Sequence, residues 1–252
     1  MSMYVNDGDH QLVSLFTAFY QQLAQLKSLQ REGELSTWLL EENQALAINE
    51  VELAALVQNR LLAQLHQQAE LLQSMGSQGE VRAYRMAQYV MAVLADEILL
   101  LECEWQGKAC WTEFLLETQL FNSATGGEGF YHYLDKLLSI RLKKPVHHSL
   151  AAIFLMALQL GFRGQYRGSQ GAPVIEQYRQ KLGRFLGAGV SLSAERLFRQ
   201  AYQGQLGNIQ LAKLRPMLRW WIMMGAGAAT YLVISSVIWL ASIQRVQHII
   251  AS

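Results

Sequence analysis

The chain has 252 residues, and its 21 basic and 20 acidic side chains leave a formal net charge of +1. This balance, with no block of Lys and Arg interleaved with aromatic residues, argues against nucleic-acid binding. The two cysteines, Cys103 and Cys110, form no CxxC pair and are too few for a disulfide framework or a zinc site. We therefore expect two reduced thiols, in the core or near the surface.

Amphipathic helices are predicted from the beginning of the chain. Apolar residues recur there at spacings of three and four, the period of a helix with one buried face. The first helix is marked by Leu12, Leu15, Phe16, Phe19, Leu23 and Leu26, and the second by Leu53, Leu56, Val57, Leu61, Leu65 and Leu72. Between them, residues 28–50 have weak periodicity and a break at Gly33, which predicts a long connection with room for a short helix.

The helical pattern continues through the middle of the chain. Further helices are predicted over 81–101, 111–120, 129–142, 146–162, 174–186 and 194–202. The three prolines, Pro145, Pro173 and Pro216, each stand where a helical pattern is about to begin. Strand-like alternation is nowhere sustained, so the expected fold class is all-α, with residues 1–214 forming a helical domain.

A transmembrane helix is predicted after this domain. No charged residue occurs from Trp220 to Gln244, and a helix of that length crosses the roughly 30 Å hydrocarbon core of a bilayer. Three basic residues within 213–219 precede the run, against Arg245 and His248 after it. This bias favours a cytoplasmic N-terminal side and a C-terminus on the opposite side of the membrane.

The expected anchor covers residues 215–244, and residues 245–252 form a short tail on the far side of the membrane, which is periplasmic if the membrane is a bacterial inner membrane. The first ten residues contain neither the basic segment nor the apolar run of a signal peptide, so the helical domain is expected to remain in the cytoplasm. Within the anchor, Gly225 and Ala229 provide a small-residue face suited to close packing against another transmembrane helix.

Asp96 and Glu97 are adjacent carboxylates within an otherwise apolar helical segment. Buried carboxylates need partners, and neighbouring side chains on a helix point about 100° apart, which is unsuited to an acid/base dyad. We expect one carboxylate to cap a neighbouring helix or to accept from an arginine while the other faces a cleft. The sequence leaves their pairing open among cations such as Arg82, Arg85 and Arg163.

Other patterns do not predict catalysis or a cofactor. Glu128 and His132 could share a helix face, but two ligands do not make a metal site. The glycine-rich segment 164–173 lacks the spacing of a phosphate-binding loop, and the motifs HExxH, GxSxG and SxxK are absent. A helical enzyme anchored by its tail, using Asp96, Glu97 and Glu128 as acid/base groups or ligands, remains the alternative from another functional class.

Three blocks, residues 91–138, residues 153–168 and the single C-terminal span, together resemble the DotU/IcmH/TssL family. The resemblance consists of an Asp-Glu pair ending an apolar helix, a Trp-rich segment, a Gly-Glu-x-Phe start and a Leu-Gly-Phe-x-Gly-x-Tyr close. The matching residues are Asp96, Glu97, Trp105, Trp111, Gly127, Glu128, Phe130, Leu160, Gly161, Phe162, Gly164 and Tyr166.

The resemblance implies an inner-membrane scaffold, not an enzyme, in a type VI secretion system or its type IVB relative. It further implies a hook-like cytoplasmic domain of two packed helical bundles, no cofactor, self-association, and two partners: an IcmF/TssM-type inner-membrane protein and cytoplasmic baseplate subunits. Since nothing after residue 252 provides a peptidoglycan-binding domain, attachment to the cell wall is expected to come from a partner.

The residues of these blocks have two open interpretations, direct contact with a partner or sealing of the junction between the two bundles. The candidates are Asp96, Glu97, Glu128, Phe130, Phe162, Tyr166 and Arg167. Gly161 and Gly164 bracket Phe162 at a predicted helix end, where glycine permits left-handed backbone and close approach.

Overall fold

The structure is a computed structural model that describes residues 7–43, 47–168 and 170–187. Its central element is the helix α4. Nearly every residue of α4 (Gln78–Glu97) from Ala87 onward is buried, and it contacts α1, α3, α5, α6 and α7. A helix that is apolar all round belongs in a core. The apolar run YVMAVLA, residues 89–95, therefore explains why the second half of α4 is buried.

The described elements are all helical, which confirms the expected fold class. In chain order they are α1 (Asp7–Glu32), α2 (Leu35–Asn43), α3 (Glu50–Met75), α4, η1 (Ile98–Glu102), η2 (Trp111–Glu113), α5 (Leu116–Phe121), α6 (Gly126–Leu138), α7 (Pro145–Gln159), η3 (Gly164–Tyr166) and α8 (Ala172–Leu186).

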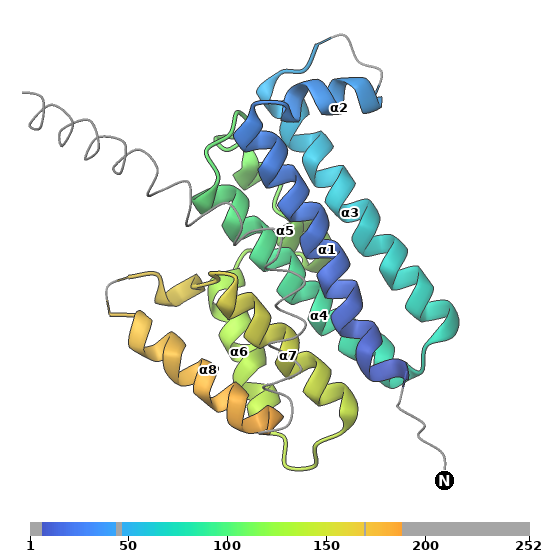
Figure 1. Ribbon diagram of the computed structural model, residues 1–252, viewed down its shortest axis with the longest axis vertical. Coiled ribbons are helices and arrows are strands. Elements are labelled where there is room, and N and C mark those ends of the chain that lie inside the picture. Colours follow the sequence, from blue (N-terminus) through green and yellow to red (C-terminus); the bar gives the residue numbers. More distant parts are fainter. Residues whose placement is uncertain (1–6, 44–46, 169, 188–252) are drawn as a thin grey trace, which may run out of the picture. The chain divides into compact units, whose positions relative to one another are not determined.

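Two groups of helices share this core, in agreement with the expected two bundles. The helices α1, α2 and α3 pack on one another, and α1 and α3 also pack on α4, while α6 and α8 pack on α7 (Figure 1). The helix α7 joins the groups because it contacts α1 and α4 as closely as it contacts α8. The described residues thus belong to one compact unit.

Local signals fix several helix ends. Asn49 and Ser77 each form a capping box with the glutamate three residues later, at the starts of α3 and α4. Pro145 occupies the first turn of α7, as predicted. Gly33 adopts a φ of +77° between α1 and α2, the left-handed conformation that glycine tolerates.

Some predicted boundaries differ from the structure. The expected connection 28–50 is largely helical, because α1 continues to Glu32 and α2 follows directly. The helix expected over 111–120 is a short 3-10 turn followed by α5. The helix expected over 129–142 begins at Gly126 and ends at Leu138. The helix expected over 194–202 and the anchor 215–244 lie outside the described residues.

Within the described residues, the segment Pro145–Tyr166 is long and apolar enough to cross a membrane by length and composition alone. Most of it is α7, whose residues Ala151, Ile153, Phe154, Ala157 and Leu158 are fully buried in the domain core. Its apolar character is therefore explained by its contacts with α1, α4 and α8.

Candidate functional site

The last turn of α4 directs two adjacent carboxylates at two different segments of the chain. Asp96 and Glu97 are 6% and 8% exposed, so each needs hydrogen-bond donors within the protein. After Glu97 the helix widens into a π turn over Ile98–Glu102, closed by a hydrogen bond from Cys103 N to Ile98 O. Turns of this kind are frequent at functional sites.

Asp96 holds the beginning of α5. One carboxylate oxygen accepts from Leu116 N at 2.9 Å and from Trp111 Nε1 at 3.2 Å, and the other accepts from Glu117 N at 2.9 Å. Leu115 at the N-cap of α5 provides no side-chain cap, so Asp96 supplies it from another helix. Burial raises the pKa of Asp96 to about 7, although the three N–H donors act in the lowering direction.

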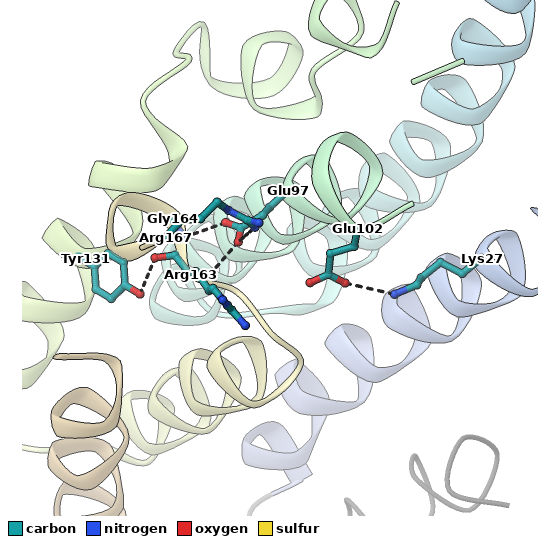
Figure 2. A network of polar contacts seen from close by, with 7 residues as sticks. All are labelled: Lys27, Glu97, Glu102, Tyr131, Arg163, Gly164 and Arg167. Carbon is teal, nitrogen blue, oxygen red and sulfur yellow. Dashed lines mark hydrogen bonds and ion pairs between the residues drawn. The ribbon is translucent and has the colours of Figure 1, made fainter. Parts of the chain in front are cut away.

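Glu97 holds the loop between α7 and α8. Its two carboxylate oxygens accept from Arg163 N at 2.8 Å and from Gly164 N at 2.9 Å, and one of them also accepts from the Arg167 guanidinium. Figure 2 shows these donors converging on Glu97, with the Tyr131 hydroxyl donating to Arg163 O at 3.0 Å from α6. The loop is therefore tied to α4 and to α6 at once.

Glycines make this loop possible. Gly161 and Gly164 have φ angles of +109° and +50°, as their pattern predicted. A Cβ at Gly164 would lie 2.8 Å from the Gly127 carbonyl oxygen, and a Cβ at Gly127 would lie 3.0 Å from Gln165 N. The loop and the first turn of α6 thus approach each other backbone to backbone, which joins two of the blocks identified in the sequence.

Aromatic rings seal the same junction. Phe130 and Phe162 are buried with their ring centroids 4.1 Å apart, and Phe130 also meets Phe154 at 4.9 Å. Tyr131 packs against Tyr166, with centroids 4.6 Å apart. Burial, with the nearby Glu97 charge as a second cause, raises the pKa of Tyr131, which keeps its hydroxyl protonated as a donor.

The outer face of the loop is accessible. A hollow of about 180 Å³ is lined by residues of the loop and of α8, among them Arg163, Tyr166 and Arg179. The Arg179 guanidinium donates to Leu158 O, but its buried Nε has no hydrogen-bond partner among the described residues. The Arg167 side chain is 37% exposed even though it pairs with Glu97. The junction therefore presents a cationic, partly aromatic rim.

The structure brings five of the predicted site residues into this junction, namely Glu97, Phe130, Phe162, Tyr166 and Arg167. Asp96 points away from it, toward α5. Glu128 is exposed on α6, outside this network. Gly225 and Ala229 lie outside the described residues.

The expectation for Asp96 and Glu97 is partly right. One carboxylate does cap a neighbouring helix, and the other does accept from an arginine. It was wrong to expect that the second faces a cleft, because Glu97 bonds to loop backbone amides instead. The arginine is Arg167, and of Arg82, Arg85 and Arg163 only Arg163 bonds to either carboxylate, through its backbone N–H.

Two buried residues of this region, Glu117 and Tyr131, are not among the site residues predicted from the sequence. Glu117 is 4% exposed and accepts from Tyr89 Oη at 3.2 Å and from Thr125 N at 3.1 Å. Tyr131 follows Phe130 on the buried side of α6, so helical periodicity could have placed it in the core, although not its bond to the loop. Nothing in the sequence around Glu117 distinguishes it from a surface glutamate.

The described residues contain no group of three or more His, Cys, Asp or Glu side chains able to hold a metal ion. The oxygens of Asp96 and Glu97 are turned toward structural N–H donors on opposite segments, so they do not address a common point as an acid/base dyad would. Cys103 is buried and Cys110 is partly exposed, which agrees with the locations expected for the two thiols.

These features define a class, an all-helical domain whose buried polar groups hold its own segments together. The family model for the type VI secretion system protein DotU matches residues 34–240. Because that match covers most of the chain, the protein belongs to the DotU family, and it is a component of the type VI secretion membrane complex.

A solved structure described as the cytoplasmic domain of TssL from Acinetobacter baumannii is also similar to the chain. The sequence identity is 20%, the TM-score is 0.44, and the similarity covers 63% of this chain and 95% of that one. No curated protein matches the chain.

Proposed function

We propose that this protein is a single-pass inner-membrane scaffold that links an IcmF/TssM-type inner-membrane protein to cytoplasmic baseplate subunits. The observation that carries the proposal is the extent of the family match, which begins in the helical domain and runs to residue 240, through most of the uncharged run. A component with both a helical domain and an anchor can make contacts on the membrane and in the cytoplasm.

The proposed organisation is a cytoplasmic domain over 1–214, an anchor over 215–244 and a periplasmic tail over 245–252. It is supported by the basic residues that precede the run. Single-cysteine labelling from the outside tests this topology, because a cysteine placed in the tail should react with an impermeant reagent and one in the domain should not. The opposite pattern would reverse the proposed orientation.

The anchor is proposed to take part in assembly as well as insertion. Gly225 and Ala229 would let another transmembrane helix approach closely, either the IcmF/TssM-type partner or a second copy of this chain. Replacing both with Leu should reduce partner recovery while leaving membrane insertion intact. Loss of insertion would mean that these residues serve the anchor itself.

The rim of the Glu97 junction is proposed as a partner contact, with the buried residues beneath it as its support. Arg163 and Arg167 are exposed and can meet an acidic surface, whereas Phe130 and Phe162 are almost fully buried and hold the loop in place. Phe130 and Phe162 are therefore assigned a supporting role, since a fully buried side chain cannot touch a partner.

Affinity purification of the detergent-solubilised full-length protein from its native host, followed by mass spectrometry, tests the proposal. Recovery of an IcmF/TssM-type protein together with baseplate subunits is expected. The variant Arg163→Ala/Arg167→Ala should lose part of that recovery, while the matched variant Arg31→Ala/Arg82→Ala, at exposed positions on α1 and α4, should not. Recovery of neither partner from folded protein would contradict the scaffold role.

A further inference from the structure

One end of the helical domain carries an unbalanced positive charge. It is formed by the last turn of α6, the loop from α6 to α7 and the end of α8. Residues 135–148 and 180–187 contain a single carboxylate side chain, Asp135, and it accepts a hydrogen bond from the Tyr178 hydroxyl at 3.0 Å. The basic side chains there are all exposed: Lys136, Arg141, Lys143, Lys144, Lys181 and Arg184.

These segments form one surface because the loop is fixed to α8. Lys143 Nζ donates to Phe185 O at 3.1 Å and lies 4.1 Å from the centroid of the Phe185 ring. His148, on the first turn of α7, lies against the same ring with centroids 5.8 Å apart. Figure 1 shows the α6–α7 loop beside the end of α8.

The tip of the loop adds an apolar group. Leu142 is 81% exposed, the most exposed of the large apolar side chains described, and it stands between Arg141 and Lys143. A single exposed leucine is ordinary on a protein surface. An exposed leucine framed by cations, however, fits a bilayer with anionic lipids, where the apolar group enters the acyl boundary and the cations meet the headgroups.

The position of this surface in the chain supports the same partner. The helix α8 ends at Leu186 in this surface, and the uncharged run begins at Trp220. If that run is inserted in the membrane, the whole domain is tethered close to the lipid. A tether raises the effective concentration of the surface near the bilayer, so a weak attraction for each charge is sufficient for docking.

We propose that this end of the domain, with Leu142 at its tip, docks on the anionic headgroups of the membrane in which the chain is anchored. The inference rests on the proposed N-terminal cytoplasmic orientation of the anchor. Docking would fix the orientation of the domain on the membrane and leave the Glu97 rim, on another part of the domain, open to partners.

Hydrogen exchange of the full-length chain in lipid nanodiscs tests this docking. One set of discs contains phosphatidylcholine alone, and the other contains phosphatidylglycerol at about a third of the lipid. We expect the backbone amides of residues 139–144 to exchange about tenfold more slowly in the anionic discs. Raising the salt to about 0.5 M should remove most of this protection, because exposed charges are then screened.

Charge-reversal variants separate lipid docking from other causes of protection. Arg141→Glu/Lys144→Glu should exchange equally in both kinds of disc, while the matched Arg31→Glu/Arg82→Glu should behave as the unmodified chain. Equal exchange of the unmodified chain in the two discs would overturn the proposal. So would protection that persists in neutral discs or in detergent, since that would indicate a protein contact.

The proposal of a membrane anchor can be wrong independently of the proposal that the basic surface docks on lipid. If the full-length chain does not enter the discs, the anchor is wrong, and the surface is then tested by flotation of the same chain with free vesicles. Preferential flotation with vesicles that contain phosphatidylglycerol would support the surface. Equal flotation with phosphatidylcholine vesicles would overturn it.

Discussion

Replacing Glu97 with Gln is the sharpest test of the junction between α4 and the α7–α8 loop. The glutamine oxygen can accept from only one of the two backbone donors, Arg163 N and Gly164 N, and the new NH₂ group faces the other. Losing a charged acceptor and leaving a buried N–H opposed by another donor costs about 2–4 kcal/mol. The loss of stability is expected in the α7–α8 loop, because this loop supplies both backbone donors.

The matched variant is Arg167→Gln. The Arg167 side chain is 37% exposed, so solvent weakens its ion pair with Glu97 and its removal should cost only about 0–1 kcal/mol. If backbone donors hold the loop, Glu97→Gln will be far more damaging than Arg167→Gln. If the ion pair holds it, the two variants will have similar effects.

Hydrogen exchange at Arg163 and Gly164 measures this difference directly. A cost of about 2 kcal/mol corresponds to roughly thirtyfold faster exchange through local opening. We expect that acceleration in Glu97→Gln, a change of less than about fivefold in Arg167→Gln, and little further effect in the double variant. Unchanged exchange at both amides in Glu97→Gln would refute the role assigned to the carboxylate.

Three further predictions concern neighbouring groups. Gly164→Ala should destabilise the protein by about 1–3 kcal/mol in urea unfolding, because its Cβ would lie 2.8 Å from a backbone oxygen of α6; Gly33→Ala, with open space around it, should cost less. Asp96 has a folded-state pKa of about 7, above its unfolded value. At pH values between the two, its carboxyl group is protonated in the folded state and ionised in the unfolded state. Its contribution to stability should fall by roughly 2–4 kcal/mol as the pH rises from about 4 to about 7, and Asp96→Asn should remove that dependence. Maleimide should label Cys110 and spare Cys103, which is buried and whose pKa burial raises; equal labelling would contradict the described packing.

The helices could largely be predicted from the sequence because their signals are local. Periodic apolar residues mark α1 and α3, and Pro145 marks the beginning of α7. The short helix α2 was harder to predict, since its nine residues give too few turns for a clear period. The π turn over Ile98–Glu102 has no pattern of its own and reads as a continuation of α4.

The candidate site could be predicted only in part, for a physical reason. The sequence indicates that Asp96 and Glu97 are buried and need donors, and the family resemblance points to the loop. However, most of those donors are backbone N–H groups, which every residue except proline carries. No residue type therefore identifies Leu116 or Gly164 as a partner before the chain is folded.

The position of the two carboxylates on one helical turn has a mechanical consequence. Asp96 bonds to the start of α5 and Glu97 bonds to the α7–α8 loop, so a pull on that loop reaches α5 through a single peptide unit. Adding or deleting one residue in α4 would turn both side chains by about 100° and release both segments together. The end of α4 therefore connects these two segments directly, and a force applied to the loop is passed on to α5 as well as to α4.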